Sequence, residues 1–144
     1  VNAFLAESQF ADTSVQHTLS PSASKDAGLG GRNTTSVKDC GELLSRIYKG
    51  ECVSKEASDA MLNLLLNQQV TTKIPSGISA SVEIANKTGE TDTDQHDIAI
   101  VCGEKTTYIL CVMSENCKSG DAVSHIRDIS GIVYNYLNMQ LDQD

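Results

Sequence analysis

The spacing of apolar residues changes at Ile74-Pro75-Ser76-Gly77, and this change constrains the fold more than any other feature of the sequence. Before this point apolar residues recur every three or four positions, which is typical of helices. After it they alternate with polar residues or form short continuous runs, which is typical of strands. Because proline and glycine interrupt regular structure, we place the boundary here. The sequence therefore predicts an α+β fold in which helices precede a sheet.

Two helices are predicted before this boundary, packed as a hairpin. The first is capped by Thr35 or Ser36 and ended by Gly50, and the second is capped by Ser54 and stops near Gln69. Residues 1–10 show helical spacing and are expected to be the tail of a helix that begins further upstream. Residues 11–35 are rich in Gly, Ser and Thr, so we expect a long loop there.

Three antiparallel strands and a helix are predicted after the boundary. Residues 82–87 alternate, whereas 98–102 and 108–113 are almost continuously apolar, as expected for central strands covered on both faces. A hairpin at residues 103–106 joins the last two strands. Ser119 is expected to cap a long helix that covers one face of the sheet, with an apolar stripe running from Ala122 to Leu137.

Composition excludes several function classes. The net charge is -8, with no cluster of basic residues, so nucleic acid is excluded as a partner. No apolar run reaches the roughly 18 residues that a membrane span needs. The five cysteines form no C-x-x-C pair, so we expect no metal site and no cofactor. Cys102 and Cys111 would lie about 13 Å apart along the ladder, too far to form a disulfide, and we interpret both as small buried hydrophobic residues.

The four residues Lys87-Thr88-Gly89-Glu90 carry the strongest chemical signal. Lys87 supplies a positive charge, Thr88 a hydroxyl donor, and Gly89 a backbone that another molecule can approach closely. This combination suits the binding of a carboxylate. It is also compatible with an ordinary strand that ends in a surface turn.

The order of landmarks along the chain resembles the C-terminal half of a class A β-lactamase, and the resemblance covers nearly the whole sequence. The landmarks are Val1-Asn2-Ala3-Phe4-Leu5, Gly31-Arg32-Asn33-Thr34-Thr35, the Leu43-Leu44 helix ending at Gly50, Ile74-Pro75-Ser76-Gly77, Lys87-Thr88-Gly89-Glu90 and His96-Asp97-Ile98-Ala99. Of the three family motifs S-x-x-K, S-D-N and K-T-G, only the third is matched.

The resemblance assigns a role to each residue of the motif. It implies that Lys87 directs positive potential at the substrate carboxylate, that Thr88 donates a hydrogen bond to it, and that Gly89 leaves room for the acyl group. The backbone N–H of Glu90 would be one of two oxyanion-hole donors. The substrate class would be a β-lactam or a cell-wall acyl-peptide, and the location would be extracytoplasmic.

The sequence departs from the family at the nucleophile and at the loop. The formal S-x-x-K match Ser22-Ala23-Ser24-Lys25 lies in the long loop without the apolar helix that should follow, so we reject it, and S-D-N does not occur. We therefore expect the nucleophile to belong to a missing N-terminal half and the isolated chain to be inactive. The loop contains Asp12 and Asp26 but no glutamate to activate water, which favours a persistent acyl-enzyme, as in a penicillin-binding protein.

The resemblance also implies a partial β-lactamase/transpeptidase-like fold. Residues 1–73 would be part of the helical subdomain, and residues 74–144 the sheet and C-terminal helix of the α/β subdomain. Because the family places N-terminal strands beside the last strand, residues 108–113 would form a bare apolar edge that pairs with the chain's own N-terminal half or with a second copy. The alternative function is a non-catalytic module that binds peptides or peptidoglycan.

Overall fold

The computed structural model describes residues 1–16 and 33–138. The predictions for Ser22-Ala23-Ser24-Lys25 and for Asp26 fall outside these residues. The chain forms two compact units, Val1–Cys40 and Gly41–Asp144. The division into subdomains at residue 73 stays a prediction.

The first unit contains helix α1 (Asn2–Glu7) and an isolated bridge between Ser14 and Thr34. Its main polar contact is the buried carboxylate of Asp39, which accepts hydrogen bonds from the Asp12 N–H at 2.9 Å and the Thr13 hydroxyl at 2.7 Å. These bonds hold the start of the predicted loop against the first turn of the helix that carries Asp39.

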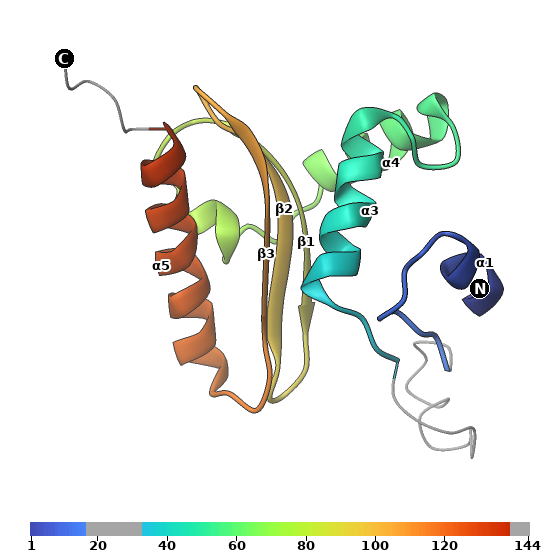
Figure 1. Cartoon of the computed structure of the whole chain (residues 1–144). Coiled ribbons are helices and arrows are strands. Elements are labelled where there is room, and N and C mark those ends of the chain that lie inside the picture. The colour runs from blue at the N-terminus through green and yellow to red at the C-terminus, as the bar shows by residue number, and fades with distance from the viewer. Residues whose placement is uncertain (17–32, 139–144) are drawn as a thin grey trace. The chain divides into compact units, whose positions relative to one another are not determined.

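The predicted helical hairpin is confirmed as α3 (Val37–Lys49) and α4 (Lys55–Leu66) (Figure 1). Gly50 follows α3 with a φ of +76°, a conformation that ends helices and favours glycine. Ser54 caps α4, since its hydroxyl oxygen accepts a hydrogen bond from the N–H of Ala57 at 3.1 Å. α4 ends three residues before Gln69, the predicted limit.

The sheet has three antiparallel strands in the order β1-β2-β3, namely β1 (Glu83–Glu90), β2 (Gln95–Cys102) and β3 (Thr107–Ser114). The pairing of Cys102 with Thr107 places the hairpin at residues 103–106, as predicted. Only β2 is central. The apolar run predicts a central strand at residues 108–113, whereas the family resemblance implies a bare edge there. The structure contradicts the first prediction and agrees with the second, because β3 lies at the edge of the sheet and its residues from Tyr108 onward are half-buried.

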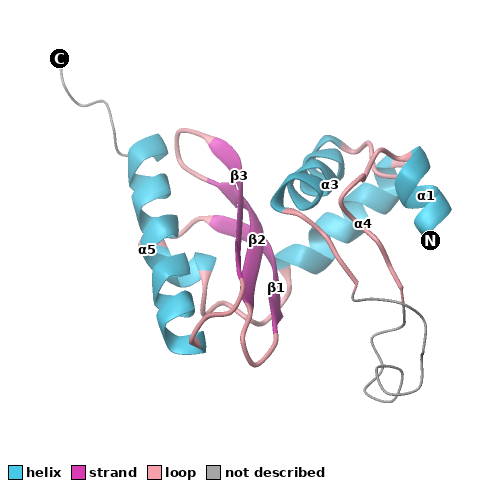
Figure 2. Cartoon of the chain, turned by 60° about the horizontal axis from the view of Figure 1, so that its bottom comes forward, coloured by secondary structure: helices cyan, strands magenta, loops and turns pink. Residues whose placement is uncertain are grey.

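Figure 2 shows helices on both faces of the sheet, and a separate hydrophobic cluster packs on each face. Helix α5 (Ser119–Asn138) and the short 3-10 helix η1 (Ile74–Gly77) cover one face, where Ile74, Val101 and Ile126 are buried. Leu44 of α3 and leucines of α4 pack with Ala85 and Ile100 on the other face. The expected C-terminal helix therefore covers one face of the sheet, and the helical hairpin contacts the opposite face.

None of the five cysteines forms a disulfide. Cys111 pairs with Ile98, four residues from Cys102 on β2, so the predicted separation of the two strand cysteines is confirmed. The prediction that they are buried is wrong, since both are half-buried. Cys111 is half-buried because it lies on the edge strand, whereas Cys102 is the last residue of β2.

Candidate functional site

The predicted binding residues occupy the last four positions of β1, and the strand distributes them over both faces of the sheet. Lys87 and Gly89 share the face of Ala85, which packs toward α3 and α4, whereas Thr88 and Glu90 alternate onto the α5 face. The side chain of Lys87 is exposed, and its ammonium lies 2.5 Å from the carbonyl oxygen of Thr88. The positive charge of Lys87 is therefore held at the open edge of β1, next to Thr88.

The contacts of Ser114 on β3 show in which direction the backbone N–H and C=O of Gln95 on β2 point. Its hydroxyl donates to the carbonyl of Gln95 at 2.8 Å and accepts from the Gln95 N–H at 3.3 Å, so the backbone groups of Gln95 face β3. Successive residues of a strand direct these groups to opposite sides, so those of His96 face its partner Gly89 on β1. The same alternation turns the N–H of Glu90 away from β2, toward the edge of β1 that has no neighbour in this sheet.

His96 is a neighbour of the motif that sequence patterns did not single out as a site residue. It pairs with Gly89, and a Cβ added at Gly89 would lie 3.5 Å from the His96 Cδ2 atom. That distance is an ordinary van der Waals contact. The imidazole therefore forms a wall beside Gly89 on the face that carries Lys87.

A buried polar cluster, consisting of Lys73, Asn86 and Asp97, lies on the α5 side of the same strands. The amide of Asn86 donates to the Asp97 carboxylate at 3.1 Å and to the Val70 carbonyl at 3.2 Å, and its oxygen accepts from the amide of Gln68. Burial raises the pKa of Asp97, although the bond from Asn86 opposes the shift. These contacts attach the segment before η1 to β1 and β2.

Lys73 places a cation beneath the strand end. Its side chain is only 1% exposed, and its ammonium contacts the carbonyl of His96 at 3.1 Å, the carbonyl of Gly89 at 3.2 Å and the carboxylate of Glu90 at 3.4 Å. An ammonium has three hydrogens, so each is matched by one acceptor. Sequence patterns missed this residue because its partners are mostly backbone carbonyls, 16 to 23 positions away.

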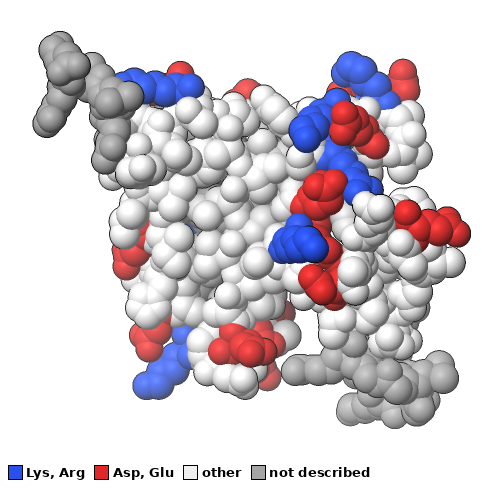
Figure 3. Space-filling view, viewed as in Figure 1, with Lys and Arg blue, Asp and Glu red and all other residues white. Residues whose placement is uncertain are grey.

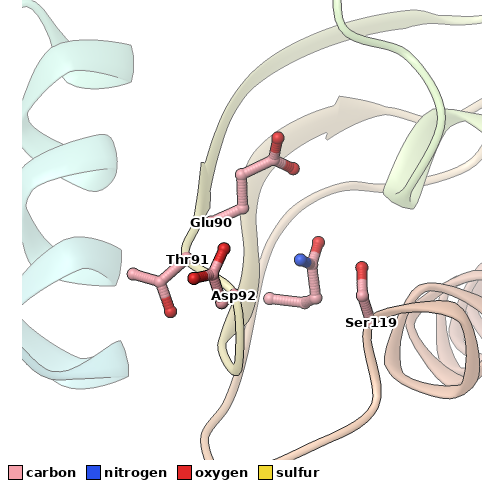
Figure 4. Close-up of a pocket in the computed structure, with 5 residues that line it drawn as sticks. Glu90, Thr91, Asp92 and Ser119 are labelled. Atoms are coloured by element: carbon pink, nitrogen blue, oxygen red, sulfur yellow. The ribbon is translucent and has the colours of Figure 1, made fainter.

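A hollow of about 430 Å³ lies on the α5 side of the strand end, lined by Glu90, Thr91, Asp92, Gln95 and Ser119. Figure 4 shows Thr91 and Asp92 beside the end of β1 and Ser119 at the start of α5. Glu90 is the one predicted site residue that lines it. The hollow therefore does not coincide with the face of Lys87 and Gly89, and its lining carries two carboxylates rather than a cation.

The described residues contain neither a metal-binding cluster nor a helix that could span a membrane. Across residues 1–16 and 33–138, no group of three or more His, Cys, Asp or Glu side chains is arranged to hold a metal ion. Among the helices in the same residues, none combines the length and apolarity required to cross a membrane.

One family model and several solved structures match this chain. The family model described as "Beta-lactamase enzyme family" matches residues 1–137. No curated protein matches the chain. The structure of PBP-A is similar with a TM-score of 0.78 and 25% identity, covering 94% of this chain and 49% of PBP-A.

Two further structures show the same fold. One is a mutant of PBP-A in an acyl-enzyme complex with penicillin G, with a TM-score of 0.76, 24% identity and coverage of 94% and 49%. The other is a representative of class A beta-lactamase from Bacteroides cellulosilyticus DSM 14838, with a TM-score of 0.78, 22% identity and coverage of 96% and 53%. The chain thus spans about half the length of the solved structures it matches.

Proposed function

Because this chain belongs to the beta-lactamase enzyme family, we propose that it is the C-terminal part of a serine hydrolase and binds the carboxylate of a β-lactam or an acyl-peptide at the end of β1. The observation that carries the proposal is the open edge of β1, which presents the exposed Lys87 and the outward N–H of Glu90 on either side of Gly89. In this role Thr88 donates a hydrogen bond to the carboxylate, and Gly89 leaves room for the acyl group.

The N–H of Glu90 would act as an oxyanion-hole donor. Donors of this kind are effective because they are fixed where negative charge develops, and the loss of one typically lowers the rate by about 10²–10³. The side chain of Glu90 is not needed for this role. The similar PBP-A mutant forms an acyl-enzyme with penicillin G, which supports β-lactams as the probe class.

The serine that forms the acyl-enzyme would be supplied by the N-terminal half of the parent polypeptide. This chain has no S-D-N and no S-x-x-K that opens an apolar helix. Since residues 9–35 also lack a glutamate, we propose that the parent forms a long-lived acyl-enzyme rather than hydrolysing β-lactams rapidly. An extracytoplasmic location is part of the same proposal and rests on the family alone.

Covalent labelling tests the proposed function. A fluorescent penicillin should label the full-length parent in a denaturant-stable manner and should not label this chain. Lys87→Ala in the parent should weaken labelling at low probe concentration, whereas Lys105→Ala, at the hairpin beyond the far end of the sheet, should leave it unchanged. Absence of labelling of the parent would contradict the proposal.

A second candidate is a non-catalytic module that binds extended peptides by strand addition. The unpaired edge of β1 favours it, because such an edge offers backbone donors and acceptors to a peptide. The sequence upstream of Val1 separates the two candidates. An S-x-x-K that opens an apolar helix supports the hydrolase, and its absence supports the peptide-binding module.

The edge strand β3 supports a proposed association. Its half-buried residues Tyr108, Leu110 and Val112 pack toward α5, and Ile109 and Cys111 toward the other face. On the side away from β2, no strand of the described residues pairs with β3. Figure 3 shows few charged side chains over β3 and α5. We propose that the parent's N-terminal half pairs with this edge, or that a second copy does so when this chain is alone. A stable monomer in size-exclusion chromatography of the chain would contradict the second case.

A further inference from the structure

We infer that Lys73 is a positioning residue for the oxyanion hole, which it orients through the peptide bond between Gly89 and Glu90. The inference rests on the proposed function and adds to it a residue outside the K-T-G motif. Lys73 is 1% exposed and its three hydrogens are occupied. It therefore acts through the backbone and does not contact a substrate.

The orientation follows from the geometry of the peptide bond. The carbonyl of Gly89 and the N–H of Glu90 belong to one planar trans unit and point in opposite directions. A hydrogen bond from Lys73 to the carbonyl, at 3.2 Å, fixes the plane of this unit. The N–H of Glu90 is thereby held toward the open edge of β1, where the proposed substrate approaches.

The charge of Lys73 adds to this effect. A cation on the carbonyl side polarises the peptide unit and makes its N–H a stronger donor, by about 10–30% for a neighbouring hydrogen bond in condensed-phase estimates. Because the ammonium is buried, water does not screen this interaction as it would at the surface. A strand end without a cation at this carbonyl, held only by the hydrogen bonds between strands, would lack this polarisation.

Lys73 is itself held on both sides. The N–H of Ile74 donates to the Asp97 carboxylate at 2.9 Å, and the carbonyl of Thr72 accepts from the Arg127 guanidinium at 2.6 Å. One anchor lies on β2 and the other on α5. The backbone on both sides of Lys73 is therefore fixed, by β2 and by α5, and this fixes the position from which its side chain extends.

The first measurement is the NMR spectrum of this chain with Lys73→Met, a substitution of similar length that removes the charge and the donors. We expect the Gly89 carbonyl ¹³C and the Glu90 amide ¹⁵N resonances to move, because the carbonyl loses its charged donor. Lys105→Met is the matched control, since Lys105 lies in the β2–β3 hairpin, beyond the end of the sheet opposite Glu90. It should leave both resonances in place.

The second measurement is acylation of the full-length parent by a fluorescent penicillin. Lys73→Met should lower the maximal acylation rate at least tenfold, and by no more than the loss of about 10²–10³ that removal of a whole oxyanion donor causes. The concentration for half-maximal rate should change little. Lys87→Ala should mainly raise that concentration. A merely structural role for Lys73 would not separate the two parameters in this way.

The outcomes distinguish the inference from the proposed function. If the unsubstituted parent is not labelled, the proposed function fails and the role of Lys73 fails with it. If the parent is labelled and Lys73→Met reacts at the same maximal rate, only the role of Lys73 is overturned. Should Lys73→Met not fold, Lys73→Gln, which also removes the charge, replaces it: a lower rate together with moved Gly89 and Glu90 resonances supports the role, and an unchanged rate overturns it.

Discussion

The carboxylate of Asp97 accepts a hydrogen bond from the backbone N–H of Ile74, with 2.9 Å between oxygen and nitrogen. Both residues are fully buried. The bond joins the central strand β2 to the start of η1, and it places the preceding residue, Lys73, beneath the end of β1. Lys73 therefore connects the buried bond between Asp97 and Ile74 to the proposed binding edge of β1.

The stability of the chain should depend on the titration of Asp97. Burial raises the pKa of this carboxyl above its usual value of 3.8, so the folded state holds the proton more tightly than the unfolded state. This contribution is fully present below pH 3.8 and is lost as pH rises through the folded pKa. Relative to Asp97→Asn, which does not titrate, the free energy of unfolding should fall with rising pH.

Urea unfolding of both proteins at a series of pH values from 3.5 upward measures this difference. If the difference instead grows with pH, the pKa of Asp97 is lowered in the folded state, and its hydrogen bonds outweigh its burial.

Gly77 should not tolerate a side chain. A Cβ at this position would lie 2.9 Å from the Cβ of Ser130 and 3.0 Å from the backbone carbon of Arg127, and the backbone of α5 cannot yield without disturbing the core. We expect Gly77→Ala to lower the free energy of unfolding by about 1–3 kcal/mol. Gly120→Ala in α5 is the control, because no atom other than those of its chain neighbours and its own helix backbone lies within 4 Å of an added Cβ. Equal unfolding midpoints for the two variants would show that η1 and α5 do not pack closely.

Gly89 should behave in the opposite way. Its φ lies outside the left-handed region, and an added Cβ would make only ordinary contacts with His96, at 3.5 and 3.8 Å. Gly89→Ala should therefore change the free energy of unfolding by less than about 0.5 kcal/mol. The same variant should weaken labelling of the parent by penicillin, because the methyl group occupies space proposed for the acyl group. A large loss of stability would assign this glycine a structural role.

Most of the fold could be predicted from the sequence because the relevant signals are local. Ser54 and Gly50 mark the helix ends by capping chemistry, and Pro75 marks the change of period. The exception among the strands was β3. Continuous apolar residues predict a strand with two covered faces, but they do not show whether a neighbouring strand is present on each side. The edge position of Tyr108 to Met113 was implied by the family resemblance and not by the apolar run, and the sheet order agrees with it.

The site was predictable only in part. Lys87, Thr88 and Gly89 form a contiguous motif, whereas Lys73 and Asp97 contribute through contacts with distant backbone groups, which leave no periodic pattern. One signal was available. Asn86 alternates in phase with the apolar Ile84, and Asp97 directly precedes an apolar run, a pattern that fits two polar residues facing the core, although it was not used for a prediction.

The most direct test of carboxylate binding at β1 is an NMR titration of the ¹⁵N-labelled chain with benzylpenicillin, compared with its methyl ester. The ester keeps the ring system and removes the charge. We predict that the free acid moves the amide resonances of Lys87 to Glu90 and that the ester does not. Equal shifts with both compounds, or shifts confined to other elements, would contradict the assignment of this strand end as a carboxylate site.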